Sequence, residues 1–362
     1  MFWQLAAISL IALVLALVIT PWVKKLALGW GALDVPGERK VHCQVMPRMG
    51  GLAIYLAFAA VVLFTQPLAR PVMGLLLGGG WIMVLGILDD IRELSARVKL
   101  VGQIIGALIL VVFGFRVDFV TNPFMEGLIL LGKLAIPVTV LWIIGVTNAL
   151  NLIDGLDGLA AGTSVIAALT MAVVVILENP AWGDTASTVV PLALILCGSI
   201  LGFLRYNFYP AKIFLGDSGS MFLGFTLAAL AIMGLTKGAT IISVFIPIVI
   251  LGIPLLDTVF AIIRRMFNGR PIFQADKHHL HHRLLEKGLS HRQAVLVIYG
   301  VNVCLGLSAI ALTQLSTDQG VILLGGLALV VLLAANRLGI TGQPAGRTVS
   351  PPAGGEKSTL HQ

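Results

Sequence analysis

Two amides and two carboxylates lie within ten residues in the segment Asn148-Ala-Leu-Asn151-Leu-Ile-Asp154-Gly-Leu-Asp157. Successive members are three residues apart, so a helix would place them along one stripe. Only 17 of the 362 residues are Asp or Glu, and a carboxylate in so apolar a chain is costly unless water, a cation or a partner meets it. An interhelical hydrogen-bond seam, common for Asn in membranes, is the alternative. Two carboxylates make the seam the weaker interpretation, and the stripe predicts a site for a cation and a polar ligand.

A second acidic pair, Asp89-Asp90, ends an apolar segment. Adjacent residues on a helix diverge by about 100°. One carboxylate could therefore face a metal or nucleophile while the other faces a basic partner. The alternative is two solvated acids at a helix end, or a pair with Arg92.

A third acid, Asp217, precedes an apolar segment in Gly216-Asp217-Ser218-Gly219-Ser220. Asp or Ser before a helix commonly caps its free backbone N–H groups. The serines could serve as caps and leave Asp217 free. A helix N-terminus of this kind also suits an anion such as phosphate.

A His-rich segment runs from Asp276 to Arg283. His278 and His282 are spaced i, i+4, as a zinc pair could be, but no third ligand such as a nearby Cys or Glu accompanies them. A basic loop that contains Arg fits a diphosphate better. A basic patch for anionic lipid is the alternative.

The composition predicts an all-α polytopic membrane protein. Hydrophobic residues make up 58% and charged residues 11%, whereas a soluble domain has about 25% charged residues. A spanning helix needs about 20 mostly apolar residues, and eleven segments meet that measure. They lie near 2–23, 50–68, 72–88, 99–115, 128–147, 158–177, 188–205, 218–235, 239–263, 293–313 and 320–336.

The basic residues predict the orientation. With the N-terminus outside, the inside segments are 24–49, 89–98, 148–157, 206–217, 264–292 and 337–362, and they hold 20 of the 24 Lys and Arg residues. The C-terminus is then cytoplasmic, and every dense polar cluster faces the cytoplasm. We expect residues 1–337 to form one transmembrane catalytic domain and residues 338–362 a disordered cytoplasmic tail. The net charge of +7 follows from this topology and from anionic lipid headgroups, and nucleic acid is excluded as a partner.

Five motifs resemble the polyprenyl-phosphate N-acetylhexosamine-1-phosphate transferase superfamily, glycosyltransferase family 4. They are Pro47-Arg-Met-Gly-Gly51, Asp89-Asp90, Asn148–Ala160, Phe214–Ser220 and His279-Leu-His-His-Arg283. They follow the family's order and cover residues from about 40 to 292. Leu280 interrupts a run of His that is consecutive in the muramoyl-pentapeptide branch. The chain is therefore most similar to the undecaprenyl-phosphate N-acetylglucosaminyl 1-phosphate transferases.

The resemblance implies a reaction in the bacterial cytoplasmic membrane. UDP-N-acetylglucosamine and undecaprenyl phosphate would give undecaprenyl-diphospho-N-acetylglucosamine and UMP, the first membrane step of a cell-envelope polysaccharide such as a teichoic acid or O-antigen. Mg²⁺ is the implied cofactor, with Mn²⁺ as an alternative. The implied partners are the two substrates and membrane lipids, and a homodimer is left open. UDP-N-acetylmuramoyl-pentapeptide or another UDP-N-acetylhexosamine is the alternative donor, and a secondary transporter is a remote alternative.

The resemblance also implies roles for individual residues. Asp217 and Asn151 would coordinate the metal. The catalytic pair would be Asp89 and Asp90 beside the lipid phosphate, with one of them a candidate base. The implied substrate-binding residues are Lys40, Arg48, Lys99, Asn148, Asp154, Asp157, Phe214, His279, His281, His282 and Arg283. Among these, Asp157 and Phe214 would hold the uridine.

Overall fold

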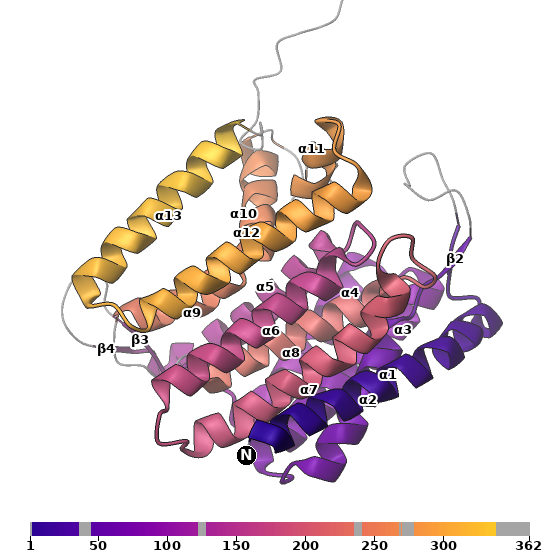
Figure 1. The fold of residues 1–362 in the computed structure, drawn as a ribbon, viewed down its shortest axis with the longest axis horizontal. Helices are drawn as coiled ribbons and strands as arrows, with labels where there is room; N and C mark the ends of the chain where they lie inside the picture. The colour runs from indigo at the N-terminus through magenta and orange to yellow at the C-terminus, as the bar shows by residue number, and fades with distance from the viewer. Residues whose placement is uncertain are drawn as a thin grey trace, which may run out of the picture.

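The residues that the computed structural model describes are mostly helical (Figure 1). The structure describes residues 2–35, 45–121, 128–234, 241–267, 269 and 279–337. Lys40, His278 and the segment 338–362, for which the sequence makes predictions, lie outside the described residues.

The helices follow the apolar segments of the sequence. They are α1 (Phe2–Trp30), α2 (Gly51–Thr65), α3 (Arg70–Arg92), α4 (Ala96–Val112), α5 (Ala135–Ile153), α6 (Leu159–Glu178), α7 (Asp184–Asn207), α8 (Gly216–Gly234), α9 (Ile241–Ile250), α10 (Gly252–Phe267), α11 (Leu280–Glu286), α12 (His291–Leu312) and α13 (Thr317–Arg337). Two short antiparallel pairs accompany them: β1 (Leu33–Asp34) with β2 (Met46–Pro47), and β3 (Phe119–Thr121) with β4 (Leu128–Leu130).

Each of the eleven predicted spans overlaps at least one helix, and the polytopic helical class is confirmed. Within the described residues, eight helices are long and apolar enough to cross a membrane. The helices α2 and α4, with 15 and 17 residues, fall below that length. The predicted count of eleven and the orientation stay predictions.

The ninth predicted span, 239–263, is two helices rather than one. The helix α9 ends at Ile250, and α10 begins at Gly252. Pro254 has no backbone N–H to donate to the carbonyl of Ile250, its usual helical partner. The continuous apolar run therefore hid a break that changes the direction of the chain before the His-rich segment.

The helix α8 forms the centre of the bundle, where 83% of its span is buried, against 11% for α13. Small residues let its first turn approach two neighbouring helices. A Cβ at Gly51 would lie 2.1 Å from the Cα of Gly219, and a Cβ at Gly86 would lie 2.3 Å from the Cα of Ser218. Close packing of α2 and α3 against the start of α8 thus fixes the position of Asp217.

Candidate active site

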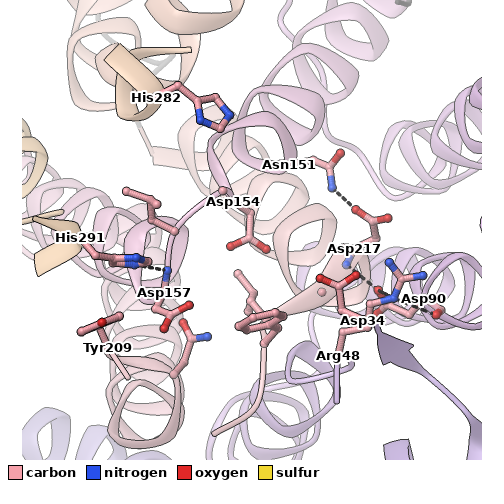
Figure 2. Close-up of a pocket in the computed structure, with 16 residues that line it drawn as sticks. Asp34, Arg48, Asp90, Asn151, Asp154, Asp157, Tyr209, Asp217, His282 and His291 are labelled. Atoms are coloured by element: carbon pink, nitrogen blue, oxygen red, sulfur yellow. Dashed lines mark hydrogen bonds and ion pairs between the residues drawn. The ribbon is translucent and has the colours of Figure 1, made fainter. Parts of the chain in front are cut away.

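A cavity of about 350 Å³ opens where the ends of several helices meet (Figure 2). Its walls come from segments far apart in the sequence, from β1 to the start of α12. The lining residues are Asp34, Arg48, Asp90, Asn151, Asp154, Gly155, Leu156, Asp157, Asn207, Tyr209, Phe214, Leu215, Gly216, Asp217, His282 and His291.

The lining residues divide into two sides with Asp154 between them. Figure 2 shows one side formed by Asp34, Arg48, Asp90 and Asp217, and the other formed by Asp157, Tyr209 and His291. Polar groups from the predicted motifs are present on both sides. The cavity can therefore hold an elongated ligand with two chemically different ends.

Asp217 lies in the first turn of α8, and both of its carboxylate oxygens have polar partners. Its Oδ1 atom accepts a hydrogen bond from the side-chain amide of Asn151. The same amide donates to Ser220 Oγ at 2.9 Å. Lys99 Nζ lies 3.3 Å from Asp217 Oδ2. The two residues predicted to hold a metal, Asp217 and Asn151, are thus in direct contact.

Asp90 caps the N-terminus of α8 from another helix. Its Oδ1 and Oδ2 atoms accept the backbone N–H groups of Asp217 and Ser218 at 2.9 and 3.1 Å. Arg48 Nε donates to the carbonyl of Asp90 at 3.0 Å. Asp90 is buried, and both of its carboxylate oxygens are engaged. This arrangement suits positioning of Asp217 more than proton abstraction.

Asp89 is buried but does not line the cavity. Its carboxylate forms an ion pair with Lys99 and accepts the backbone N–H of Leu94 at 2.7 Å. Lys99 also contacts Asp217. Lys99, which does not line the cavity either, thus links Asp89 to Asp217, and the expectation that Asp89 lies beside the lipid phosphate stays a prediction.

The acid-amide stripe is only partly helical. The helix α5 ends at Ile153, so Asp154 follows it and Asp157 lies in the turn before α6. Asp157 Oδ2 accepts the backbone N–H of Ala211 at 2.9 Å, and its own backbone N–H donates to His291 Nε2 at 2.9 Å. The turn is thus held by the chain after α7 and by the start of α12.

Five carboxylates line the same cavity: Asp34, Asp90, Asp154, Asp157 and Asp217. Burial raises the pKa of Asp154 well above its usual range, and the negative charges of Asp217, Asp90 and Asp157 raise it further. A cation would relieve this repulsion. No group of three or more His, Cys, Asp or Glu residues with metal-site geometry occurs among the described residues. Mg²⁺ does not require one, because it binds one or two carboxylates together with waters and phosphate oxygens.

Asn148, predicted to bind substrate, lies outside the cavity wall. It forms a reciprocal amide pair with Gln103 of α4, with N···O distances of 2.8 and 3.2 Å. Asn148 thus takes part in an interhelical hydrogen-bond seam, which was the alternative interpretation of the stripe.

The His-rich motif forms the short helix α11, and its members separate. His282 lines the cavity. His279 Nδ1 lies 2.8 Å from Asp257 Oδ2, and both side chains are buried. Arg283 pairs with Glu286 at 3.3 Å and does not line the cavity. Asp257 also accepts the backbone N–H of Leu280 at 2.8 Å, so His279 and Asp257 anchor α11.

His281 is buried against the turn after α5. A Cβ at Gly155 would lie 2.3 Å from His281 Nε2, so the glycine allows this contact. Burial lowers the pKa of His281 to about 3, and the neighbouring His282 adds to the effect. His281 is therefore neutral near pH 7, and its predicted contact with the diphosphate or sugar, which stays a prediction, would be that of an uncharged imidazole.

The sequence interpretation missed four polar lining residues: Asp34, Asn207, Tyr209 and His291. The rings of Tyr209 and His291 stack with centroids 4.5 Å apart. Asn207 Oδ1 accepts the backbone N–H of Gly158 at 3.1 Å. All four lie in predicted inside segments. Their position on the same predicted side as the motifs was the only sequence signal that could have linked them to the site.

Comparison with known proteins agrees with the motifs. A family profile described as glycosyl transferase family 4 matches residues 72–235. A "probable undecaprenyl-phosphate N-acetylglucosaminyl 1-phosphate transferase" of Bacillus subtilis is 49% identical over 84% of this chain and 83% of its own length. A decaprenyl-phosphate N-acetylglucosaminephosphotransferase of Mycolicibacterium smegmatis is 39% identical over 82% and 79%, respectively.

A more distant relative, a phospho-N-acetylmuramoyl-pentapeptide-transferase of Desulforudis audaxviator, is 33% identical over 83% of this chain and 95% of its own length. The similarity thus extends over most of the chain. The chain belongs to glycosyl transferase family 4, the polyprenyl-phosphate N-acetylhexosamine-1-phosphate transferase superfamily.

Proposed function

We propose that the chain transfers N-acetylglucosamine 1-phosphate from UDP-N-acetylglucosamine to undecaprenyl phosphate. The products are undecaprenyl-diphospho-N-acetylglucosamine and UMP. The observation that carries the proposal is the two-sided cavity, with acids and Arg48 on one side and an aromatic pair beside Asp157 on the other. The relatives from Bacillus subtilis and Mycolicibacterium smegmatis support the sugar, because both names specify N-acetylglucosamine.

The chemistry requires one phosphate oxygen to attack another phosphorus against the repulsion between anions. Arg48 contributes fixed positive charge at the cavity wall, and it suits phosphate through its planar guanidinium. Asp217 and Asn151 would hold Mg²⁺, and the chemistry it would supply is positive charge that offsets the negative charge growing on the leaving UMP. Asn151 and Lys99 hold the Asp217 carboxylate in place for that task.

The opposite side of the cavity suits the nucleoside. The exposed Tyr209, stacked on His291, supplies aromatic surface there for a uracil ring, and Phe214 also lines the cavity. Asp157 is fixed by its bond from Ala211, which leaves Oδ1 as an acceptor for a nucleoside hydroxyl or N–H group. His282 belongs to the His-rich helix α11 and lines the cavity from that side. We assign it to the sugar or the diphosphate.

A general base is not required for this reaction. The second pKa of a phosphate monoester is about 6, so the lipid phosphate is mostly deprotonated near neutral pH. Asp90 uses both oxygens to hold α8, and Asp89 is paired with Lys99. We therefore assign both acids to positioning.

The alternative donor is UDP-N-acetylmuramoyl-pentapeptide, which the relative from Desulforudis audaxviator favours by its name. The same cavity would serve both donors, and the difference would lie in the contacts of the sugar. We further propose that the protein resides in the bacterial cytoplasmic membrane, with the N-terminus outside and the cavity at the cytoplasmic face. A homodimer is compatible with this arrangement.

The test is UMP release by the purified protein, with each UDP-sugar offered in turn. UMP should appear only when UDP-N-acetylglucosamine, undecaprenyl phosphate and Mg²⁺ are all present, and Asp217→Asn should abolish it. The matched control is Asp118→Asn, because Asp118 is exposed and does not line the cavity. If UMP were released only with UDP-N-acetylmuramoyl-pentapeptide, that donor would replace UDP-N-acetylglucosamine in the proposal. Substrate uptake into vesicles without UMP release would refute the transferase.

A further inference from the structure

Three helices contribute side chains to the surroundings of the Asp217 carboxylate. Lys99 lies in α4, Asn151 in α5 and Asp217 itself in α8. Lys99 Nζ lies 3.3 Å from Asp217 Oδ2, and the Asn151 amide donates to Asp217 Oδ1. We call these three residues the metal-site layer, because Asp217 and Asn151 are the proposed ligands of Mg²⁺. Their arrangement depends on how the three helices are placed along their axes.

A second polar layer joins the same three helices about one helical turn further into the bundle. It consists of Gln103 of α4, Asn148 of α5 and Met221 of α8. Each member is three or four residues from the member of the metal-site layer on its own helix. Such spacings place two side chains on the same helix face, one turn apart. The second layer therefore accompanies the first on all three helices.

The side-chain N–H groups of Gln103 and Asn148 all have partners. The Gln103 amide donates to Asn148 Oδ1 at 3.2 Å and to Met221 Sδ at 3.4 Å. The Asn148 amide donates to Gln103 Oε1 at 2.8 Å and to the carbonyl of Ile144 at 2.9 Å. Gln103 is buried, where an amide without such partners would be costly. The second layer is thus a satisfied hydrogen-bond network between α4 and α5, with a contact to α8.

Stability alone does not explain the two amides. Replacing both members of a hydrogen-bonded pair by apolar side chains of similar shape can be nearly neutral for stability. Hydrogen bonds differ from apolar contacts because they need a donor–acceptor distance close to about 3 Å. A slide of α4 along α5 by one residue is about 1.5 Å, and it would break both bonds between the amides. The pair therefore selects one axial register.

We propose that the Gln103–Asn148 pair positions the metal-site layer. By fixing α4 and α5 in register, it places their members of that layer at the Asp217 carboxylate. The contact to Met221 extends the same constraint to α8. Asn148 then serves the reaction through Asn151, one turn away on its own helix, and not by touching substrate. This inference rests on the proposed function, specifically on a divalent cation held by Asp217 and Asn151.

The experiment measures metal binding directly. Full-length protein in mild detergent, with UMP present to supply phosphate oxygens, is titrated with Mn²⁺, and free Mn²⁺ is measured by electron paramagnetic resonance. The double variant Gln103→Leu, Asn148→Leu removes both amides, so neither is left without its partner. Changes to residues that support metal ligands lower metal affinity about 10–100-fold, so the double variant should bind Mn²⁺ at least about tenfold more weakly. Asp217→Asn, which removes a proposed ligand, gives the signal of a lost site.

Steady-state kinetics separate positioning from general damage to the fold. In the double Leu variant, the Mg²⁺ concentration that gives half-maximal UMP release should rise about tenfold. The KM for UDP-N-acetylglucosamine at saturating Mg²⁺ should stay close to the wild-type value. Damage to the fold would instead lower kcat and the melting temperature and leave the half-maximal Mg²⁺ concentration unchanged.

A swap of the two side chains tests register. Gln103→Asn shortens one member of the pair by a methylene and should weaken Mn²⁺ binding. Adding Asn148→Gln restores the combined length of the pair and should restore Mn²⁺ binding. If the double Leu variant does not fold, Gln103→Asn and its rescue by Asn148→Gln carry the test.

The matched control removes another buried polar pair, between α12 and α6. Asn302 Nδ2 lies 3.5 Å from Thr163 Oγ1, and both residues are buried. Neither helix carries a member of the metal-site layer. Asn302→Leu with Thr163→Val should therefore leave Mn²⁺ affinity at the wild-type value.

Several outcomes overturn the proposal. One is wild-type Mn²⁺ affinity in the double Leu variant, or in Gln103→Asn where the Leu variant does not fold. Others are an equal loss of affinity in the control pair and a swap that recovers none of the affinity lost in Gln103→Asn. A wild type that binds no Mn²⁺ overturns the metal assignment together with this inference. If wild type binds Mn²⁺ but releases no UMP from any UDP-sugar, the proposed function alone fails.

Discussion

The Oδ1 atom of Asp90 accepts the backbone N–H of Asp217 at 2.9 Å. A carboxylate from the end of α3 thereby fixes the first turn of α8. The side chain of Asp217 faces the cavity from that turn. The two acids thus have linked roles, in which one carboxylate places the other.

The first prediction concerns this cap. Asp90→Asn keeps the size of the side chain but replaces one acceptor oxygen by an NH₂ group, which would face a backbone N–H. We expect a loss of about 1–3 kcal/mol in the free energy of unfolding, the cost of an unsatisfied buried donor. UMP release should fall at least tenfold. Thermal denaturation and steady-state kinetics check both effects, and normal stability with a shifted pH–rate profile would instead support a base role.

The second prediction concerns the buried ion pair of Lys99 and Asp89. Lys99→Gln leaves the Asp89 carboxylate buried without its cation, which should lower the free energy of unfolding by about 3 kcal/mol. The double variant Asp89→Asn, Lys99→Gln should recover most of that loss, because no charge is left unpaired. Activity should stay low in both, since Asp217 loses its contact with Lys99. Additive losses of stability in the double variant would contradict this account.

The third prediction tests the approach of α3 to α8. Gly86→Ala puts a Cβ at 2.3 Å from the backbone of Ser218, which neither helix can relieve without moving. We expect a loss of about 1–3 kcal/mol in the free energy of unfolding, together with reduced UMP release. The matched control is Gly145→Ala in α5, whose Cβ meets nothing within 4 Å. It should be neutral or stabilising by up to about 1 kcal/mol, and equal losses in the two variants would rule out the close contact as the cause.

The fourth prediction concerns pH. The pKa of Asp154 is raised in the folded protein, whereas an unfolded Asp titrates near 4. The folded state therefore binds this proton more tightly, so the contribution of Asp154 to stability is full below about pH 4 and falls as pH rises toward the raised pKa. Without divalent cations, Asp154→Asn should remove the decrease in the free energy of unfolding between pH 4 and pH 7. It should therefore stabilise the protein at pH 7 by an amount on the order of 1 kcal/mol.

Denaturation measured at pH 4 and pH 7 checks this expectation, with Asp118→Asn as an exposed control. Added Mg²⁺ should reduce the difference between Asp154→Asn and wild type, because a cation offsets the crowded charges. If Asp154→Asn were less stable than wild type at pH 7 without metal, the charged Asp154 carboxylate would stabilise the fold, and this account would be contradicted.

The helices and the clustering of the motifs were predictable because both follow from local composition. Apolar runs of sufficient length give helices in a membrane chain, and the bias of basic residues assigns their ends to one side. Composition and charge bias alone therefore predict that Asp90, Asn151, Asp157 and Asp217 share one face. The cavity contains all four.

The remaining features depend on partners distant in sequence. Asp90 bonds to backbone N–H groups, which carry no signature in the sequence. The sequence interpretation did not foresee that the amide of Asn148 pairs with Gln103 of α4, 45 residues away, and that Asn148 does not line the cavity. A lone glutamine in an apolar helix was the signal that could have corrected it. His291 was missed because its role depends on the fold of the Asp157 turn.

The residues that line the cavity are far apart along the chain, and this separation has a consequence for biosynthesis. Its walls include Asp34 near the start of the chain and His291 near the end. At about 5–20 residues per second, tens of seconds of translation separate the two. The early helices thus enter the membrane long before the ribosome supplies the last wall. A truncated chain without α12 lacks His291 and its contact with the Asp157 turn, so we expect premature termination to give an inserted protein with an incomplete cavity.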